Sequence, residues 1–451
     1  MNDNDTICAL ATAPGGAIAI IRISGPQSLE ITSSVCRNSI TAQATNTIRY
    51  NHIVTPSGET IDEVMVSVFQ NPHSYTGEDC VELSCHGSRY IVQRILDLLV
   101  EKGCRMAQPG EYTQRAFLNG KLDLSQAEAV ADLIASTNKA THQLAINQLR
   151  GGFSSELATL RDHLLHLTSL LELELDFSDH EDLEFADRTE LQTLAETIDQ
   201  RITTLAHSFE TGQALKQGIP VAIVGKTNVG KSTLLNALLN DERAIVSDIH
   251  GTTRDTIEET LDINGVTFRF IDTAGLRETS DTVEQIGIER TRKAIAQARI
   301  IIWLLDTEPT EAELLEMQQL SAGKSALFVH NKSDLLSSTS TFIPYLTPLL
   351  LISAKTHNHI DTLKQKIFEA ANLPHLSDSD VIITNARHYA ALTTAHSHLL
   401  RVLDGLHTNL PGDLLSEDLR LVLTTLGDIT GSAITPQETL NNIFKHFCVG
   451  K

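Results

Sequence analysis

A glycine-rich segment from Gly225 to Ser232 has the residue types that hold a nucleotide triphosphate. It reads G-K-T-N-V-G-K-S, and it lies between the apolar run Ile219–Val224 and the helix-like stretch Thr233–Leu239. Glycines let backbone N–H groups converge on phosphate oxygens, and the start of a helix adds its dipole. Lys231 would place a cation on the β- and γ-phosphates, and Ser232 would offer a hydroxyl to Mg²⁺. The segment therefore predicts a strand–loop–helix phosphate site.

Two later segments have side chains that could respond to the γ-phosphate. Gly251-Thr252-Thr253-Arg254-Asp255 contains threonines that can reach Mg²⁺ and the γ-phosphate. The apolar run Val266–Ile271 ends in Asp272-Thr273-Ala274-Gly275, where the aspartate can hold Mg²⁺ through water and the Gly275 N–H can meet the phosphate. We interpret these segments as two switch regions.

The base of the nucleotide is indicated by a third set of residues. Asn331-Lys332-Ser333-Asp334 follows the apolar run Ala326–His330, and Ser353-Ala354-Lys355 follows the next one. Alone, the first motif could be a surface turn, but a carboxylate at Asp334 matches the two N–H donors of guanine. All five segments follow strands, where ligands bind in open α/β sheets. The order favours GTP over ATP, with contacts expected from Gly225, Asn228, Val229, Gly230, Lys231, Ser232, Thr233, Ser247, Thr252, Thr253, Asp272, Thr273, Ala274, Gly275, Asn331, Lys332, Asp334, Ser353, Ala354 and Lys355.

The residue after the second switch motif is not a glutamine, the side chain that would orient the water that attacks the γ-phosphate. Leu276 occupies that position, and its side chain forms no hydrogen bond. Either hydrolysis is slow, or another group positions the water. Arg277, Glu278 and Glu284 follow in the same region, and for each of them a solvated charge is the simpler interpretation and a catalytic role the alternative.

The elements that must position these residues fall into four segments. At roughly 150 residues per domain, 451 residues predict about three domains. Residues 1–120 read as mixed α/β, with strands at Ala17–Ile23 and Val64–Phe69 and a helix at Tyr90–Val100. Residues 217–376 alternate strand and helix, which predicts a doubly wound parallel sheet. Leucines at helical spacing fill residues 121–216 and 377–451, so we predict one helical domain interrupted by an inserted α/β domain.

Composition limits the class of protein. The net charge of −22 excludes a globally basic nucleic-acid coat but leaves room for a local basic groove. No apolar run approaches the ~18 residues of a membrane span, and the acidic start has no basic n-region. The six cysteines form no C-x-x-C pair, so we expect a reducing cytoplasm. Cys80, Cys85 and His86 lie close together but lack a second ligand pair for zinc.

One stretch, Glu172 to Glu190, holds nine carboxylates and a single arginine. A solvated helix end and loop is the simpler interpretation, because charge runs usually face water. A docking face for a basic partner is the alternative.

The whole chain resembles the MnmE (TrmE) family of tRNA wobble-uridine modification GTPases. Four segments carry the resemblance: Asp5 to Pro26 with its I-I-R-I-S-G-P end, Tyr75 to Asp79 with Glu82 and His86-Gly87, Pro109 to Leu124, and the terminal Phe447-Cys448-Val449-Gly450-Lys451. The resemblance implies an N-terminal α/β domain of the folate-binding, dimerising kind. It also implies a helical domain interrupted by a Ras-like P-loop GTPase domain.

The resemblance assigns further site residues. It implies that Arg22, Glu82, Lys121 and Lys451 bind 5-formyl- or methylene-tetrahydrofolate, whose carboxylates suit Arg and Lys and whose pterin edge suits a carboxylate. Cys448 corresponds to a C-terminal cysteine of the family, implying a functional thiol that would need a depressed pKa.

The resemblance also implies a K⁺-dependent mechanism. Asn228, with Ser247, Ile249 and Thr252, would bind K⁺ where other GTPases use an arginine finger, beside the Mg²⁺ held by Ser232 and Thr253. Glu284 would orient the water, with Lys231 as the second catalytic residue and Cys448 as the third. This chain departs from the family pattern at Thr227, where a proline is usual, and in the turn Pro14–Ala17, which lacks an arginine.

The function that follows is a cytoplasmic, homodimeric GTPase that acts on tRNA. With an FAD-dependent partner, in a heterotetramer, it would add a carboxymethylaminomethyl-type group at C5 of the wobble uridine. Two alternatives remain: a GTP-switched ribosome-assembly binding protein without folate, and a folate-binding structural dimer with a vestigial GTPase. The intact Lys231, Ser232, Asp272 and Asp334 argue against the latter.

Overall fold

The computed structural model describes residues 5–176, 188–239, 259–271, 284–335, 349–373 and 380–432, with 440, 443–445, 447 and 450. For residues 173–176 and 284–290 it describes the backbone alone. Two compact units divide the chain. The first takes in 1–135, 145–203 and 390–451, and the second takes in 136–144 and 204–389.

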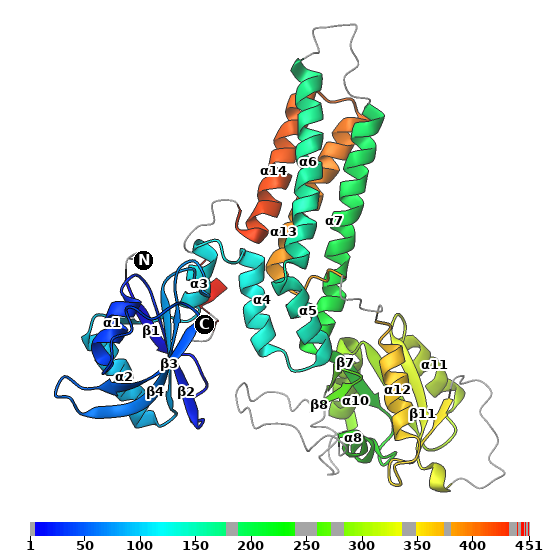
Figure 1. The fold of residues 1–451 in the computed structure, drawn as a ribbon. Coiled ribbons are helices and arrows are strands. Elements are labelled where there is room, and N and C mark those ends of the chain that lie inside the picture. The colour runs from blue at the N-terminus through cyan, green and yellow to red at the C-terminus, as the bar shows by residue number, and fades with distance from the viewer. Residues whose placement is uncertain are drawn as a thin grey trace. The chain divides into compact units, whose positions relative to one another are not determined.

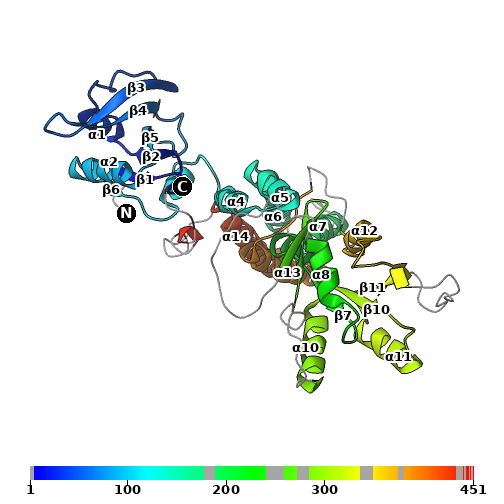
Figure 2. The ribbon, with the colours of Figure 1, turned by 90° about the horizontal axis from the view of Figure 1, so that it is seen from below.

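The first unit begins with a six-stranded sheet in the order β3-β4-β5-β2-β1-β6. Neighbouring strands are antiparallel, apart from the parallel pair of β1 and β6. Helices α1 and α2 pack on one face through a core that includes Ile21, Val66, Leu83 and Leu99 (Figure 2). The expected strands and helix of this region are confirmed. The elements are β1 (Ile7–Leu10), β2 (Ile18–Ser24), α1 (Ser28–Val35), β3 (Thr47–Val54), β4 (Thr60–Phe69), β5 (Cys80–His86), α2 (Arg89–Glu101), β6 (Arg105–Met106) and α3 (Glu111–Leu118).

Long helices form the rest of the first unit. The leucine stripe of α6 from Leu157 to Leu171 is buried, and α6 packs along α14 (Figure 1). The stripes beginning at Leu191, Leu392 and Leu415 are buried as well, apart from the half-buried Leu194 and Leu403, as amphipathic spacing predicts. The helices are α4 (Leu124–Ala135), α5 (Lys139–Leu149), α6 (Gly152–Asp176), α7 (Arg188–Gln217), α13 (Ala386–His407) and α14 (Gly412–Thr430), of which α5, α7 and α13 also extend into the second unit.

The second unit contains a six-stranded sheet in the order β12-β11-β10-β7-β9-β8. Helices α8 and α12 share a core with one face, and α10 and α11 share a core with the other, so the sheet is doubly wound (Figure 2). The elements are β7 (Ile219–Val224), α8 (Lys231–Leu239), β8 (Glu259–Ile263), β9 (Val266–Phe270), α10 (Glu284–Gln297), β10 (Ile300–Leu305), α11 (Glu311–Leu320), β11 (Ser325–His330), β12 (Leu349–Leu351) and α12 (Ile360–Ala370).

One edge of this sheet differs from the expected all-parallel arrangement. Strand β8 runs antiparallel to β9, and only Asn264 and Gly265 separate the two strands. A two-residue connection can join only antiparallel neighbours, because a parallel pair needs a long crossover. The remaining pairs are parallel, and the predicted fold class of α/β and helical domains is confirmed.

A search of the described residues finds no helix that is long and apolar enough to cross a membrane.

Candidate functional site

The phosphate loop joins the end of β7 to the start of α8, as its spacing predicts. A Cβ on Gly225 would lie 2.3 Å from the carbonyl oxygen of Leu304, so no larger residue fits there. Gly230 has φ +98°, and its Cβ would lie 2.4 Å from Nδ2 of Asn331. Both glycines are therefore required by close approach, and the second also by its backbone conformation.

Lys231 stands in the first turn of α8 and faces the loop. Its Nζ donates to the carbonyl oxygens of Gly225 at 2.7 Å and Lys226 at 2.8 Å. Burial lowers the pKa of Lys231, because a charged ammonium loses water contacts there. A partly desolvated cation attracts phosphate oxygens more strongly than one in open water. Ser232 and Thr233 are exposed beside it at the helix start.

Asn331 connects the phosphate loop to the segment expected at the base. Its Nδ2 donates to the carbonyl of Val229 at 2.8 Å, and its Oδ1 accepts from the backbone N–H of Ala354 at 3.0 Å. The residue is 3% exposed. Three segments that are far apart in sequence are thus held together by one buried amide.

Asp334 has the geometry expected of a base-reading carboxylate. Ser353 Oγ donates to its Oδ1 at 2.6 Å, and this hydrogen bond lowers the pKa of Asp334. The carboxylate is exposed and ionised, so it can accept the paired donors of guanine. Lys355 lies in the turn that follows Ser353, also exposed.

Lys332 has two partners, one of which sequence reasoning missed. Its Nζ donates to the carbonyl of Asn228 at 2.9 Å and forms an ion pair with Asp306 at 2.6 Å. Asp306 follows the buried strand β10 directly, at the same sheet edge as the other site residues. The sequence could have indicated Asp306 as a site residue, because it is a carboxylate directly after a buried strand.

Several predicted site residues lie outside the described part of the chain. They are Ser247, Ile249, Thr252, Thr253, Asp272, Thr273, Ala274, Gly275, Cys448 and Lys451. The backbone of Glu284 begins α10, and its side chain lies outside the described atoms.

The first unit brings together the residues expected at the folate. Arg22 and Glu82 are paired across β2 and β5, and Arg22 Nε donates to Glu82 Oε1 at 2.9 Å. Arg22 Nη1 also donates to the carbonyl of Gly450 at 3.2 Å. Gly450 therefore lies beside Arg22, and the predicted Lys451 is the next residue in the sequence.

Aromatic rings surround the same guanidinium. Its carbon lies 5.5 Å from the ring centre of Tyr75 and 5.7 Å from that of Tyr112. Lys121 approaches the same loop, because its Nζ donates to the carbonyl of Pro72 at 2.9 Å and its side chain packs on Gly77. Arg22, Glu82 and Lys121 thus all border the 72–82 segment.

A buried ion network supports this loop, and sequence reasoning did not identify it. Arg115 forms ion pairs with Asp5, Glu78 and Glu111, and Glu78 accepts from Ser24 Oγ at 2.7 Å. Burial opposes ionisation of Glu111, but hydrogen bonds from Arg105 and the backbone of Gln108 lower its pKa. In the sequence, the only indication of this network was that the segments that carry the family resemblance contain residues of opposite charge.

The cysteines near His86 do not converge. Cys80 and Cys85 are five residues apart on β5 and therefore project from opposite faces of the sheet. Burial raises the pKa of Cys80 to about 12 and that of Cys85 to about 11. Nowhere in the described ranges do three or more His, Cys, Asp or Glu side chains gather into a group that could hold a metal ion.

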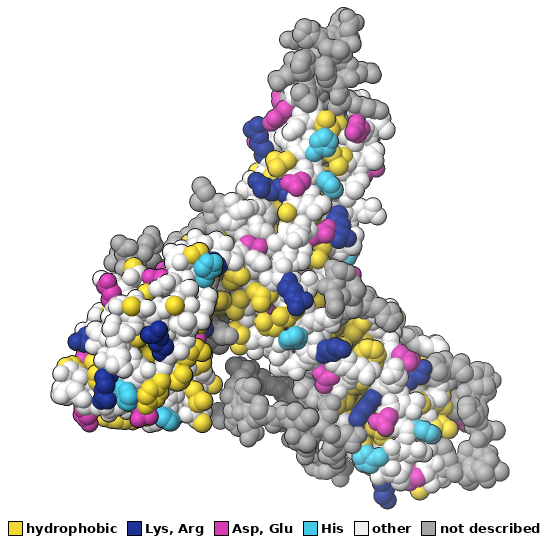
Figure 3. All heavy atoms as spheres, viewed as in Figure 1, with side chains coloured by type: hydrophobic (Ala, Val, Ile, Leu, Met, Phe, Trp, Pro, Cys, Tyr) yellow, Lys and Arg dark blue, Asp and Glu magenta, His cyan; other side chains and the backbone are white. Residues whose placement is uncertain are grey.

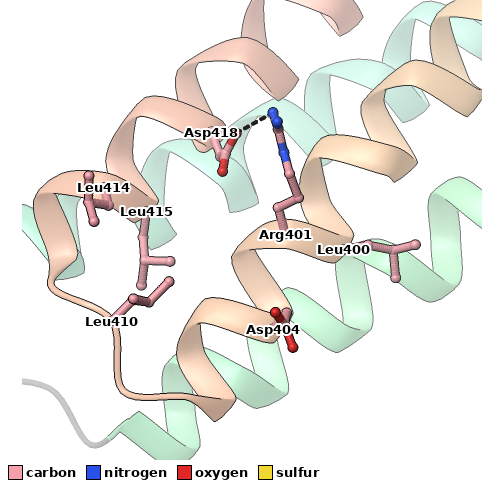
Figure 4. A pocket seen from close by; sticks show the side chains of 7 residues that line it. All are labelled: Leu400, Arg401, Asp404, Leu410, Leu414, Leu415 and Asp418. Atoms are coloured by element: carbon pink, nitrogen blue, oxygen red, sulfur yellow. Dashed lines mark ion pairs between the residues drawn. The ribbon is translucent and has the colours of Figure 1, made fainter.

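A cavity of about 390 Å³ lies between α13 and α14, and none of its lining residues is a predicted site residue (Figure 4). An ion pair between Arg401 and Asp418 borders it, and leucines form most of the remaining wall. It contains no group that the sequence assigns to catalysis.

Comparison with known proteins places the chain in one family. The family model described as the GTP-binding protein TrmE N-terminus matches residues 6–121, and the one described as the MnmE helical domain matches residues 124–448. The chain is 56% identical to the tRNA modification GTPase MnmE of Parabacteroides distasonis, over 99% of this chain and 100% of that protein. It is 52% identical to the proteins of the same name from Phocaeicola vulgatus and Flavobacterium johnsoniae, over 100% of both chains in each case. This chain therefore belongs to the MnmE (TrmE) family of tRNA modification GTPases.

Proposed function

We propose that this protein hydrolyses GTP to drive modification of tRNA at C5 of the wobble uridine. With an FAD-dependent partner it adds a carboxymethylaminomethyl-type group, and a tetrahydrofolate supplies the carbon. The observation that carries the proposal is that Lys231, Asn331 and Asp334 follow strands β7 and β11 of one sheet and are fixed there by hydrogen bonds with Gly225, Val229 and Ser353. They do so within a chain that belongs to this family along its length.

The nucleotide would be held by groups with separate tasks. Lys231 and the amides of the phosphate loop neutralise the phosphates, and Asp334 reads the guanine edge. The donors fit a magnesium nucleotide, because Ser232 offers an exposed hydroxyl in the first turn of α8 and Thr253 would supply a second oxygen. Bound Mg²⁺ would neutralise charge that develops on the phosphates.

Potassium and the attacking water complete the proposed hydrolytic site. Asn228, the residue assigned to K⁺, has φ +63°, a left-handed backbone conformation. Oxygens of Ser247, Ile249 and Thr252 would complete the K⁺ site, and Glu284 would orient the water in place of the missing glutamine. Lys231 supplies the fixed cation of the site.

The one-carbon carrier would bind at the first unit. Its glutamate carboxylates suit Arg22, Lys121 and Lys451, and its pterin donors suit Glu82. The fit is supported by the half-buried ring of Tyr75 beside Arg22, which offers apolar surface next to charge. Cys448 belongs to the same chain end, so we place its thiol near this carbon.

A homodimer is supported by an apolar face of the first sheet. Ile18, Ile48, Tyr50 and Met65 are 42–66% exposed, and their strand pairing places them on the face opposite the helices. Hydrophobic side chains gather over this domain in Figure 3. A second copy that covers this face would be consistent with a dimer, to which two FAD-dependent partners add to make a heterotetramer.

The direct test is GTP turnover in KCl and in NaCl at equal ionic strength, with ATP as the control nucleotide. We expect GTP hydrolysis that is much faster in KCl and absent with ATP. Slow turnover that does not depend on the cation would remove the K⁺ site and favour a simple binding switch. Equal turnover of ATP would overturn the guanine assignment.

A further inference from the structure

The turn between β8 and β9 lies between the two segments expected to sense the γ-phosphate. Strand β8 begins just after residues 251–258, and β9 ends just before residues 272–283. The turn itself is tight, because Asn264 has φ +55° and Gly265 has φ +80°, the pattern of a type I′ hairpin. Any displacement of either switch segment would act on this hairpin through the chain.

The first turn of α5 is attached to this hairpin. The backbone N–H of Ala140 donates to the carbonyl of Gly265 at 3.0 Å, and Asn138 Nδ2 donates to Thr267 Oγ1 at 2.8 Å. Asn138 also caps α5, because its Oδ1 accepts from the N–H of Thr141 at 2.8 Å.

Packing strengthens the attachment. Ala140 is buried in the core that contains Leu261 and Phe268 of the hairpin, and Leu144 packs against that core. A Cβ on Gly265 would lie 2.8 Å from Cβ of Lys139, so the turn and the helix are already in close contact. Burial on this scale makes the hairpin and the start of α5 move as one body.

The far end of α5 belongs to the other unit and is attached there. Residues 136–144 fall in the second unit, whereas 145–149 fall in the first. Gln148 Nε2 donates to the carbonyl of Ser125 at 3.0 Å, and Gln126 Nε2 donates to the carbonyl of Leu149 at 3.0 Å. Helix α5 is therefore tied to α4, which packs on α3 and follows Lys121 by three residues.

We propose that α5 transmits the nucleotide state from the β8–β9 hairpin to α4 and the one-carbon site, with Asn138 and Thr267 as the positioning residues that couple them. The proposal rests on the proposed function. A helix can carry such coupling because it is stiff and has one discrete partner at each end. A nucleotide that moves the hairpin must then move α5 or break the Asn138–Thr267 hydrogen bond.

Thr267→Val removes the hydroxyl that accepts the hydrogen bond from Asn138. Valine has nearly the same shape as threonine and suits a strand, and the cap that Asn138 forms on α5 is unchanged. Thr260→Val is the matched control, because Thr260 is exposed on the neighbouring strand. Both variants are studied in the full chain with GDP and with a non-hydrolysable GTP analogue. Amide hydrogen exchange is measured over 139–149 and 259–271, beside GTP turnover and wobble-uridine modification with the partner and tRNA.

We expect the exchange of α5 to differ between the two nucleotides in the wild type and in Thr260→Val, and to differ less in Thr267→Val, which keeps only the backbone hydrogen bond of Ala140 and the packing. Modification by Thr267→Val should fall about fivefold, the lower end of typical coupling factors, while GTP turnover stays near the wild-type rate. Wild-type exchange over α5 that is equal in both nucleotides, while the hairpin changes, would overturn the proposal. So would full modification by Thr267→Val. A wild-type protein that neither hydrolyses GTP nor modifies tRNA would instead overturn the proposed function.

Discussion

The ammonium of Lys332 donates to the backbone carbonyl of Asn228 at 2.9 Å, and so it joins the base-reading segment to the phosphate loop. Asp306 fixes that ammonium through an ion pair at 2.6 Å. Asn228, the residue assigned to K⁺, lies on the loop after β7 and has a left-handed backbone conformation. It is held there by Lys332, which follows β11, and through Lys332 by Asp306, which follows β10.

Asp306→Asn should weaken GTP binding because Lys332 loses the charge that holds it against Asn228. The pair is partly exposed, so we expect a loss of about fivefold in affinity rather than more. Titration of a fluorescent GTP analogue measures it, with Glu308→Gln as the control on the same exposed segment. Equal affinities for the two variants would show that Asp306 does not position the loop.

Asp334→Asn should reduce GTP affinity at least about tenfold, because hydrogen bonds from the base to a charged acceptor are lost. Xanthosine triphosphate, which carries a carbonyl where guanine has an amino group, should bind the variant better than it binds the wild type. Competition between the two nucleotides measures the change. Unchanged preference for GTP would place the base elsewhere.

The hydrogen bond from Ser353 also predicts how GTP binding responds to acid. Because it lowers the pKa of Asp334, the carboxylate stays ionised as pH falls through the ordinary aspartate range, and binding is retained there. In Ser353→Ala the pKa rises toward its ordinary value, so affinity should fall at a higher pH than in the wild type. Identical pH profiles between about pH 3.5 and pH 6 would contradict this reading.

Glu111→Gln should destabilise the first sheet and its helices. The carboxylate is 1% exposed and pairs with Arg105 and Arg115. Both arginines keep Asp5 as a partner, so the loss of charged hydrogen bonds should cost about 2 kcal/mol. Its lowered pKa means that this stability is present above the ordinary glutamate pKa and is lost as pH falls through the folded value.

Urea unfolding at pH 7 and near pH 3 measures the difference, with the exposed Glu101→Gln as the control. The difference in the free energy of unfolding between the wild type and Glu111→Gln should be smaller at the lower pH. A gap that is the same at both values would mean that the carboxylate does not act through its charge.

Arg22→Lys should weaken binding of 5-formyltetrahydrofolate about tenfold, because an ammonium cannot replace the fork that contacts Glu82 and the chain end. Calorimetric titration measures the affinity. Arg94→Lys, on the exposed side of α2, should bind the folate as the wild type does. Equal loss in both variants would remove Arg22 from the site.

The nucleotide site was predictable to the extent that its signals are local. Gly225 to Ser232 forms one strand–loop–helix unit, and Asn331 to Asp334 follows one strand, so spacing alone located both. Asp306 was not predictable in this way, because its role depends on the position of Lys332 across the sheet. The buried cluster around Arg115 joins residues over a hundred positions apart and leaves no periodic pattern.

The fold, like the site, was predictable where its signals are local in the sequence. Buried apolar runs and leucine stripes located the strands and helices, since burial imposes those periods on the sequence. The antiparallel direction of β8 follows from the turn at Asn264 and Gly265, a hairpin signal between Ile263 and Val266 that the prediction of a parallel sheet did not use. The attachment of Asn138 to Thr267 depends on tertiary packing that no single segment encodes. The boundaries between the four predicted segments stay predictions.

The central claim is tested most directly by mass spectrometry of wobble nucleosides in tRNA from cells that lack this gene. The gene is restored as the wild type, as Lys231→Ala or as Asp334→Asn. We predict that the C5-substituted uridine disappears on deletion, returns with the wild type and stays absent or much reduced with either variant. Normal levels of the modified uridine in the deletion strain would contradict the account.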